Sequence, residues 1–88
     1  MLKGTTESGF KFKIDERIAD DLELLEDIAR ADKDVTVFPA VLERVLGEKQ
    51  KAALYDHIRK EHGYVSTQAT VDMFTEIMNL AGEATKNS

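Results

Sequence analysis

The chain has 88 residues, of which 42% are hydrophobic and 33% charged, and its net charge is −5. This length gives one domain, and this composition is typical of a folded chain and not of a disordered one. The absence of cysteine excludes disulfides and thiolate metal sites and favours a reducing cytoplasm. No apolar run approaches the ~20 residues that span a bilayer, and no signal-peptide segment follows Met1.

The first fourteen residues have the pattern of a β-hairpin. Phe10, Phe12 and Ile14 alternate with lysines, as in a strand with one buried face. Leu2–Thr5 is the predicted partner strand, and Thr6–Gly9 has the composition of the turn between them. Because an isolated hairpin is marginal in water, we expect its apolar face to pack on helices downstream.

Acidic residues dominate the next segment. Residues 15–34 contain nine acidic residues against three basic ones, a local net charge of −6. Such a segment repels phosphate backbones, so we expect no nucleic-acid partner.

The same segment predicts a turn and then a helix. Asp15 can cap a short turn over residues 15–19, and Asp20 with Glu23 has the form of a capping box for a helix over residues 21–31. A single bent helix is the alternative. The predicted inward stripe consists of Ile18, Leu22, Leu25, Ile28 and Ala29.

Three further helices are expected after a polar connector. The first has Pro39 in its first turn and is ended by Gly47, and the second covers Glu48–His62. Asp56 and Lys60 can pair on the outside of this second helix. The last helix is capped by Ser66 or Thr67 and runs to about Ala81, before Gly82. The predicted buried residues of the first two are Val41, Leu42, Val45, Leu46, Leu54, Tyr55 and Ile58.

The expected fold is therefore α+β and mostly α, with an N-terminal β-hairpin packed on about four short helices. Residues 1–82 form a single globular domain, and residues 83–88 form a frayed C-terminal tail.

The last helix has an apolar arc that covers nearly half of its circumference, more than a core-facing helix needs. One flank, which we assign to the core, consists of Val71, Phe74, Met78 and Ala81. The other flank, which we assign to a partner, consists of Met73, Ile77 and Leu80. An apolar surplus of this kind predicts a homo-oligomer. It also predicts that Ile77→Asp weakens partner binding and that Phe74→Asp unfolds the domain.

Catalytic and metal sites find no support in the residues. His57 and His62 are five residues apart, so they point in different directions on a helix and cannot easily share a metal. Asp32–Asp34 lacks the glycine and the closing glutamate of a calcium loop. The three serines have turn, cap and tail contexts. We therefore predict no catalytic, cofactor-binding or metal-binding residue, and no enzyme activity.

Several short runs together resemble one protein family. They are the N-terminal MLKGTTESGF with Phe12 and Ile14, LELLE at Leu22–Glu26, LGEKQK at Leu46–Lys51, EHGYV at Glu61–Val65, and the KNS ending at Lys86–Ser88. Over essentially its whole length the chain resembles the short tail assembly chaperones of siphophages and of prophages of Gram-positive bacteria.

This resemblance implies a non-catalytic protein of the host cell cytoplasm that is absent from the mature virion. Such chaperones bind the helical tape measure protein and recruit tail tube subunits around it. Met73, Ile77 and Leu80 would bind the tape measure protein, while Glu23, Glu26 and Asp27 would steer its basic segments.

Two other classes of function stay open. Residues 38–62 could supply the two helices of a small phage helix-turn-helix regulator or anti-repressor, although the second helix carries Glu48, Asp56 and Glu61. A small enzyme or enzyme subunit is the other class.

Overall fold

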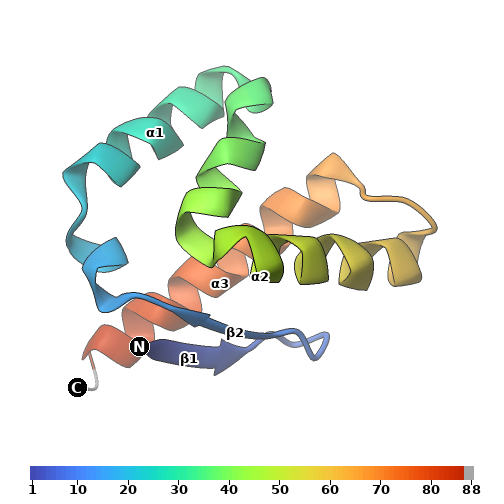
Figure 1. Ribbon diagram of the computed structural model, residues 1–88, viewed down its shortest axis with the longest axis horizontal. Coiled ribbons are helices and arrows are strands. Elements are labelled where there is room, and N and C mark those ends of the chain that lie inside the picture. Colours follow the sequence, from blue (N-terminus) through green and yellow to red (C-terminus); the bar gives the residue numbers. More distant parts are fainter. Residues whose placement is uncertain (87–88) are drawn as a thin grey trace.

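The computed structural model describes residues 1–86 and shows an N-terminal two-stranded hairpin packed on three α-helices (Figure 1). The predicted α+β, mostly α fold class is confirmed. In chain order the elements are β1 (Leu2–Thr5), β2 (Lys11–Ile14), the 3₁₀ helix η1 (Glu16–Asp20), α1 (Leu22–Lys33), the 3₁₀ helix η2 (Val35–Val37), α2 (Phe38–His62) and α3 (Thr67–Lys86).

The hairpin has the predicted strands, and they pair in antiparallel register from Leu2 with Ile14 to Thr5 with Lys11. The turn is closed at Thr6, whose backbone N–H donates to the carbonyl of Phe10 and whose side chain accepts from the Phe10 N–H. β1 packs on α3 and β2 packs on α2, so the apolar face of the hairpin closes one side of the core.

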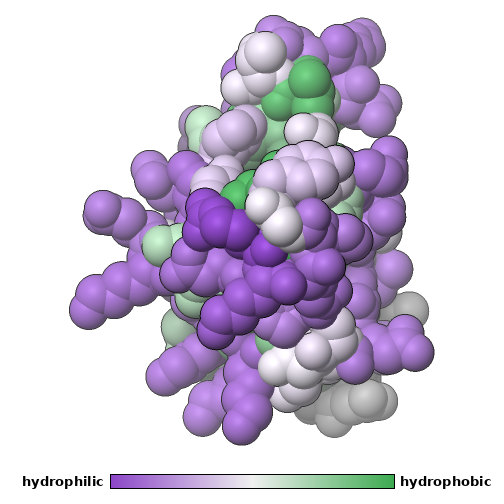
Figure 2. Space-filling model, turned by 90° about the vertical axis from the view of Figure 1, so that its right-hand side faces the viewer, coloured by the Kyte–Doolittle hydropathy of each residue, from purple (hydrophilic) through white to green (hydrophobic). Residues whose placement is uncertain are grey.

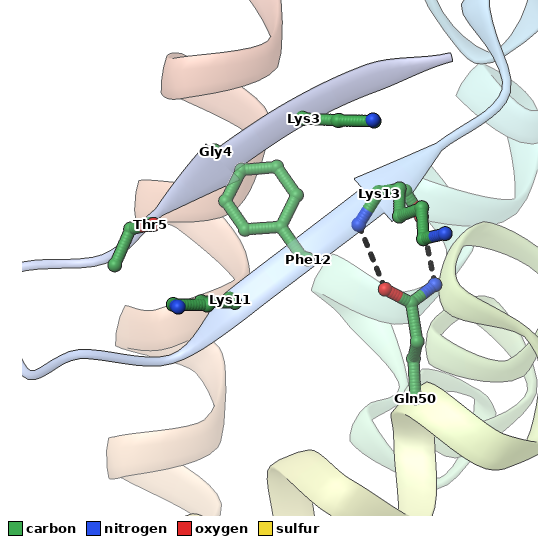
Figure 3. A pocket seen from close by; sticks show the side chains of 7 residues that line it. All are labelled: Lys3, Gly4, Thr5, Lys11, Phe12, Lys13 and Gln50. Carbon is green, nitrogen blue, oxygen red and sulfur yellow. Dashed lines mark hydrogen bonds between the residues drawn. The ribbon is translucent and has the colours of Figure 1, made fainter.

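Gly4 is required where the hairpin meets the core. A Cβ at this position would lie 2.6 Å from Cζ of Phe12, whose ring is buried directly opposite (Figure 3). The ring cannot retreat without disturbing the core, because protein interiors are close-packed.

Alanine at two glycines is therefore expected to have opposite effects. Gly4→Ala should lower the free energy of unfolding by about 1–3 kcal/mol through overpacking against Phe12. Gly82→Ala should raise it by about 0.5–1 kcal/mol, since Gly82 lies inside α3 and a Cβ there meets nothing within 4 Å. Urea denaturation of both variants measures the difference, and a Gly4→Ala protein as stable as the wild type would contradict the close approach.

The short turn followed by a helix is confirmed, with one correction. Asp15 caps η1 by accepting from the N–H of Arg17. Asp21, and not the predicted Asp20, caps α1, because its carboxylate accepts from the N–H of Leu24 at 3.1 Å. The helix consequently begins at Leu22 and extends to Lys33.

The two predicted helices on either side of Gly47 are the two halves of α2. Gly47 has φ 79° and ψ 164°, a backbone conformation that is essentially restricted to glycine, and the helix bends there. Pro39 lies in the first turn and the helix ends at His62, both as predicted, and Gly63 caps that end in the left-handed conformation. Asp56 pairs with Arg59 instead of the predicted Lys60.

The last helix is longer than predicted. Ser66 is its cap, since its hydroxyl accepts from the N–H of Ala69. α3 then continues through Gly82 to Lys86, so the expectation of a tail from residue 83 is wrong for residues 83–86. Residues 87–88 lie outside the described residues.

The core contains the predicted apolar residues of the hairpin and of α2, with Tyr55 only partly buried. It draws on every α-helix and on both strands. Its side chains with 2% exposure or less are Ile14, Leu24, Val41, Leu42, Leu54, Ile58 and Ile77.

Candidate partner-binding surface

The partner-binding flank predicted on α3 is largely inside the protein. Ile77 is 0% exposed and belongs to the core, together with Phe74 and Ala81. Met73 and Leu80 are partly buried and pack against that core. Ile77 is therefore wrong as a surface anchor, because no partner can reach it in the folded chain.

Neighbouring elements account for this burial. The turn of the hairpin lies against α3, where the N–H of Glu7 donates to the Glu76 carboxylate at 2.7 Å. The Ser8 hydroxyl lies 3.7 Å from the sulfur of Met73. The apolar surplus that predicted self-association through α3 is thus mostly covered by the chain itself, and self-association stays a prediction.

Of the five large hydrophobic side chains that are exposed among the described residues, three lie on α1 and η2, and Met1 and Tyr64 are the other two. Leu22 is 69% exposed, Leu25 61% and Val35 54%. The sequence placed Leu22, Leu25 and Ala29 in the inward stripe, and this prediction is wrong, because all three are exposed. The buried residue of α1 is Leu24, and Ile28 and Ala31 pack beside it against the core.

Helical geometry explains the correction. At 100° per residue, Leu24, Ile28 and Ala31 fall within about 60° of one another, and this stripe faces α2. Leu22 and Leu25 occupy the adjoining flank of the same helix. α1 therefore has a wide apolar arc, of which only one half is covered.

The uncovered flank of α1 faces an open apolar groove. A hollow of ≈ 530 Å³ is lined from α1 by Leu25 and Ile28, from η2 by Val35, and from α3 by Val71 and Phe74. A second hollow of ≈ 350 Å³ shares Leu25 and Ile28 and continues to Ile18, Leu22 and Met78. We call these two hollows together the α1–α3 groove. In Figure 1, α1 lies apart from α3 and is held mainly by α2 and η2.

Arg44 neutralises part of the acidic surface of α1. Its guanidinium contacts the carboxylate of Asp21 at 3.2 Å and that of Asp27 at 3.0 Å, which ties α1 to α2. The pKa of Asp21 lies below its ordinary value, first because the Leu24 N–H donates to the carboxylate and second because Arg44 does. Asp27, predicted to steer partners, is thus committed to Arg44 and to Arg30.

Two carboxylates that line the groove, those of Asp20 and Asp32, have no such partner among the residues that the structure describes. Glu23 and Glu26, the other predicted steering residues, are exposed on α1 but line neither hollow. Asp20 lines the groove at its η1 end, and Asp32 lines it at its η2 end. The groove therefore has an unpaired negative charge at each end.

The outer face of the hairpin is basic. Lys3, Lys11 and Lys13 surround a shallow hollow of ≈ 410 Å³ over Phe12 (Figure 3). The side-chain amide of Gln50 accepts from the Lys13 N–H and donates to the Lys13 carbonyl, so it occupies the open edge of β2 there. No buried side-chain nitrogen or oxygen among residues 1–84 lacks a hydrogen-bond partner, so none is left for a ligand in this hollow and we assign it no ligand.

Ser8, in the hairpin turn, contacts His57 in the second half of α2. The turn and this part of α2 lie at the right of Figure 1, and that side of the molecule is mostly hydrophilic (Figure 2). The hydroxyl lies 2.9 Å from Nε2 of His57, but the carboxylate of Glu61 lies 3.2 Å from the same nitrogen. A catalytic triad needs the acid on Nδ1, so that the imidazole can pass a proton from the hydroxyl. The contacts instead hold the hairpin turn against α2.

Over the described part of the chain, no group of three or more histidine, cysteine, aspartate or glutamate side chains is arranged to hold a metal ion. None of the described helices combines the length and the apolar character needed to cross a bilayer.

Comparisons with models of known protein families, with curated proteins and with solved structures found no match.

Proposed function

We propose that this protein is a non-catalytic tail assembly chaperone of a long-tailed bacteriophage. In this function it binds the tape measure protein and recruits tail tube subunits in the host cytoplasm. The sequence resemblance suggests the class of protein. The observation that carries the proposal is the exposed apolar flank of α1, which borders an open groove in so small a domain. Exposed apolar surface of this kind usually marks a protein-binding site.

The charge distribution supports a protein partner over a nucleic acid. The second half of α2 would be the recognition helix of a helix-turn-helix regulator, but its exposed residues include Glu48, Asp56 and Glu61 among the lysines and arginines. Its four basic residues are nearly balanced by these three acidic ones, so the helix has only a weak net attraction for phosphates.

Co-expression tests the proposal directly. The tagged chain, produced together with the tape measure protein or the tail tube protein of the same phage, should retain its partner on an affinity column. An unrelated helical protein produced in the same way should not be retained. If neither tail protein is captured, the chaperone proposal fails. A shift of DNA mobility at low salt would favour the regulator instead.

A further inference from the structure

We propose that the α1–α3 groove binds a basic amphipathic helix of about three turns, supplied by a partner protein. This inference names the chemistry of the partner of the proposed function and rests on that function for the partner's origin.

The walls of the groove favour a helix over an extended peptide. Both walls are helices, whose backbone groups are bonded within the helix and cannot pair with an added strand. A segment bound between them has to satisfy its own backbone hydrogen bonds, which a helix does. α1 has 12 residues, about 18 Å at 1.5 Å per residue, so the groove matches about three turns of a second helix.

The lining of the groove specifies the apolar side of that helix. Leu25 protrudes at the point that the two hollows share, with Val35 towards one end and Leu22 towards the other. A partner helix with apolar residues at positions i, i+3 or i+4, and i+7 can pack on all three.

The ends of the groove specify the charge of the partner. Asp20 and Asp32 are exposed, line opposite ends, and have no ion-pair partner among the described residues. Lysine or arginine on the flanks of the partner helix would meet these carboxylates, which accelerates association and selects against acidic partners.

The same charges disfavour a second copy of this chain in the groove. A symmetric dimer through α1 would bring two copies of residues 15–34, each with a net charge of −6, against one another. Like charges placed together at an interface oppose association.

A synthetic peptide can test the groove without any phage protein. The probe is a fluorescein-labelled 14-residue leucine–lysine peptide whose leucines recur at helical spacing. Its controls are a scrambled peptide of the same composition and a leucine–glutamate peptide with the same spacing. By fluorescence anisotropy, only the amphipathic leucine–lysine peptide should bind tightly to the wild-type chain.

Substitutions then separate apolar docking from charge attraction. Leu25→Asp should weaken binding at least ~10-fold, as expected for a central anchor, although it makes the groove more negative. Ala52→Asp adds the same charge to an exposed position on the second half of α2 and should leave the affinity unchanged. The double variant Asp20→Asn, Asp32→Asn should weaken binding and flatten its salt dependence, whereas Glu48→Gln should do neither. Circular dichroism checks that each variant is folded.

The following results would contradict docking of a basic helix in the α1–α3 groove. Wild-type affinity in folded Leu25→Asp protein, or equal binding of the scrambled peptide, would show that the helix does not dock in the groove. The wild-type chain could instead fail to bind the peptide and sediment as a dimer that Leu25→Asp converts to a monomer. That result would assign the groove to a second copy of the chain. If the Leu25→Asp variant still captures the tape measure protein, the groove is not the binding site, but the proposed function stands. If the wild-type chain does not capture it, the proposed function itself is refuted.

Discussion

Ile77→Asp is expected to unfold the domain. The Ile77 side chain is completely buried at the centre of α3, and an aspartate there would have to lose its hydration without gaining a partner. We expect a loss of more than ~4 kcal/mol, which is comparable to the total stability of a domain of this size. Circular dichroism should show loss of helix at 25 °C.

Asn79→Asp is the matched control on the same helix. Asn79 is exposed, so the same acidic side chain stays in water and the free energy of unfolding should change by less than ~0.5 kcal/mol. Folded Ile77→Asp protein that only loses partner binding would restore the site predicted from sequence, because Ile77 would then have to be accessible.

Leu24→Ala and Leu25→Ala should differ sharply although the two residues are neighbours. Leu24 is 1% exposed, and its truncation should lower the free energy of unfolding by about 2–5 kcal/mol through lost burial and a cavity. Leu25 is 61% exposed, so its truncation should cost less than ~0.5 kcal/mol.

Urea denaturation of the two variants measures the two losses of stability for the same substitution, leucine to alanine. Because each loses the same atoms, the difference in the midpoint reports only where each side chain lies. Equal losses of stability would mean that the flank of α1 with Leu25 is covered, and the α1–α3 groove would then not be open.

The hairpin could be predicted from sequence because its signals are local. Phe10, Phe12 and Ile14 alternate with lysines, and the residues between the strands have turn composition, so pairing and register follow from neighbours in the chain. The break at Gly47, predicted as the end of a helix, and the predicted end of the next helix at His62, before Gly63, have the same kind of local signal. Both glycines have positive φ, which few other residues adopt.

The end of α3 could not be predicted in this way. Gly82 carries a local signal for a stop, but the helix continues for four more residues. Ala81 before the glycine and Ala84 after it both pack on the core, and burial of a helix face outweighs the ~1 kcal/mol that glycine costs in a helix.

The sequence by itself determined the hairpin, the approximate positions of the main helices, the acidic character of residues 15–34 and the presence of more apolar surface than one small core requires. Only the tertiary structure decided where that surplus lies. Both α1 and α3 have wide apolar arcs, and a helical wheel cannot show which flank another element will cover. The hairpin and α2 cover the arc of α3 and bury Ile77, whereas α1 packs mainly on α2 and η2 and leaves Leu22 and Leu25 exposed. Burial depends on contacts between segments far apart in the chain, and periodicity within one helix carries no information about them.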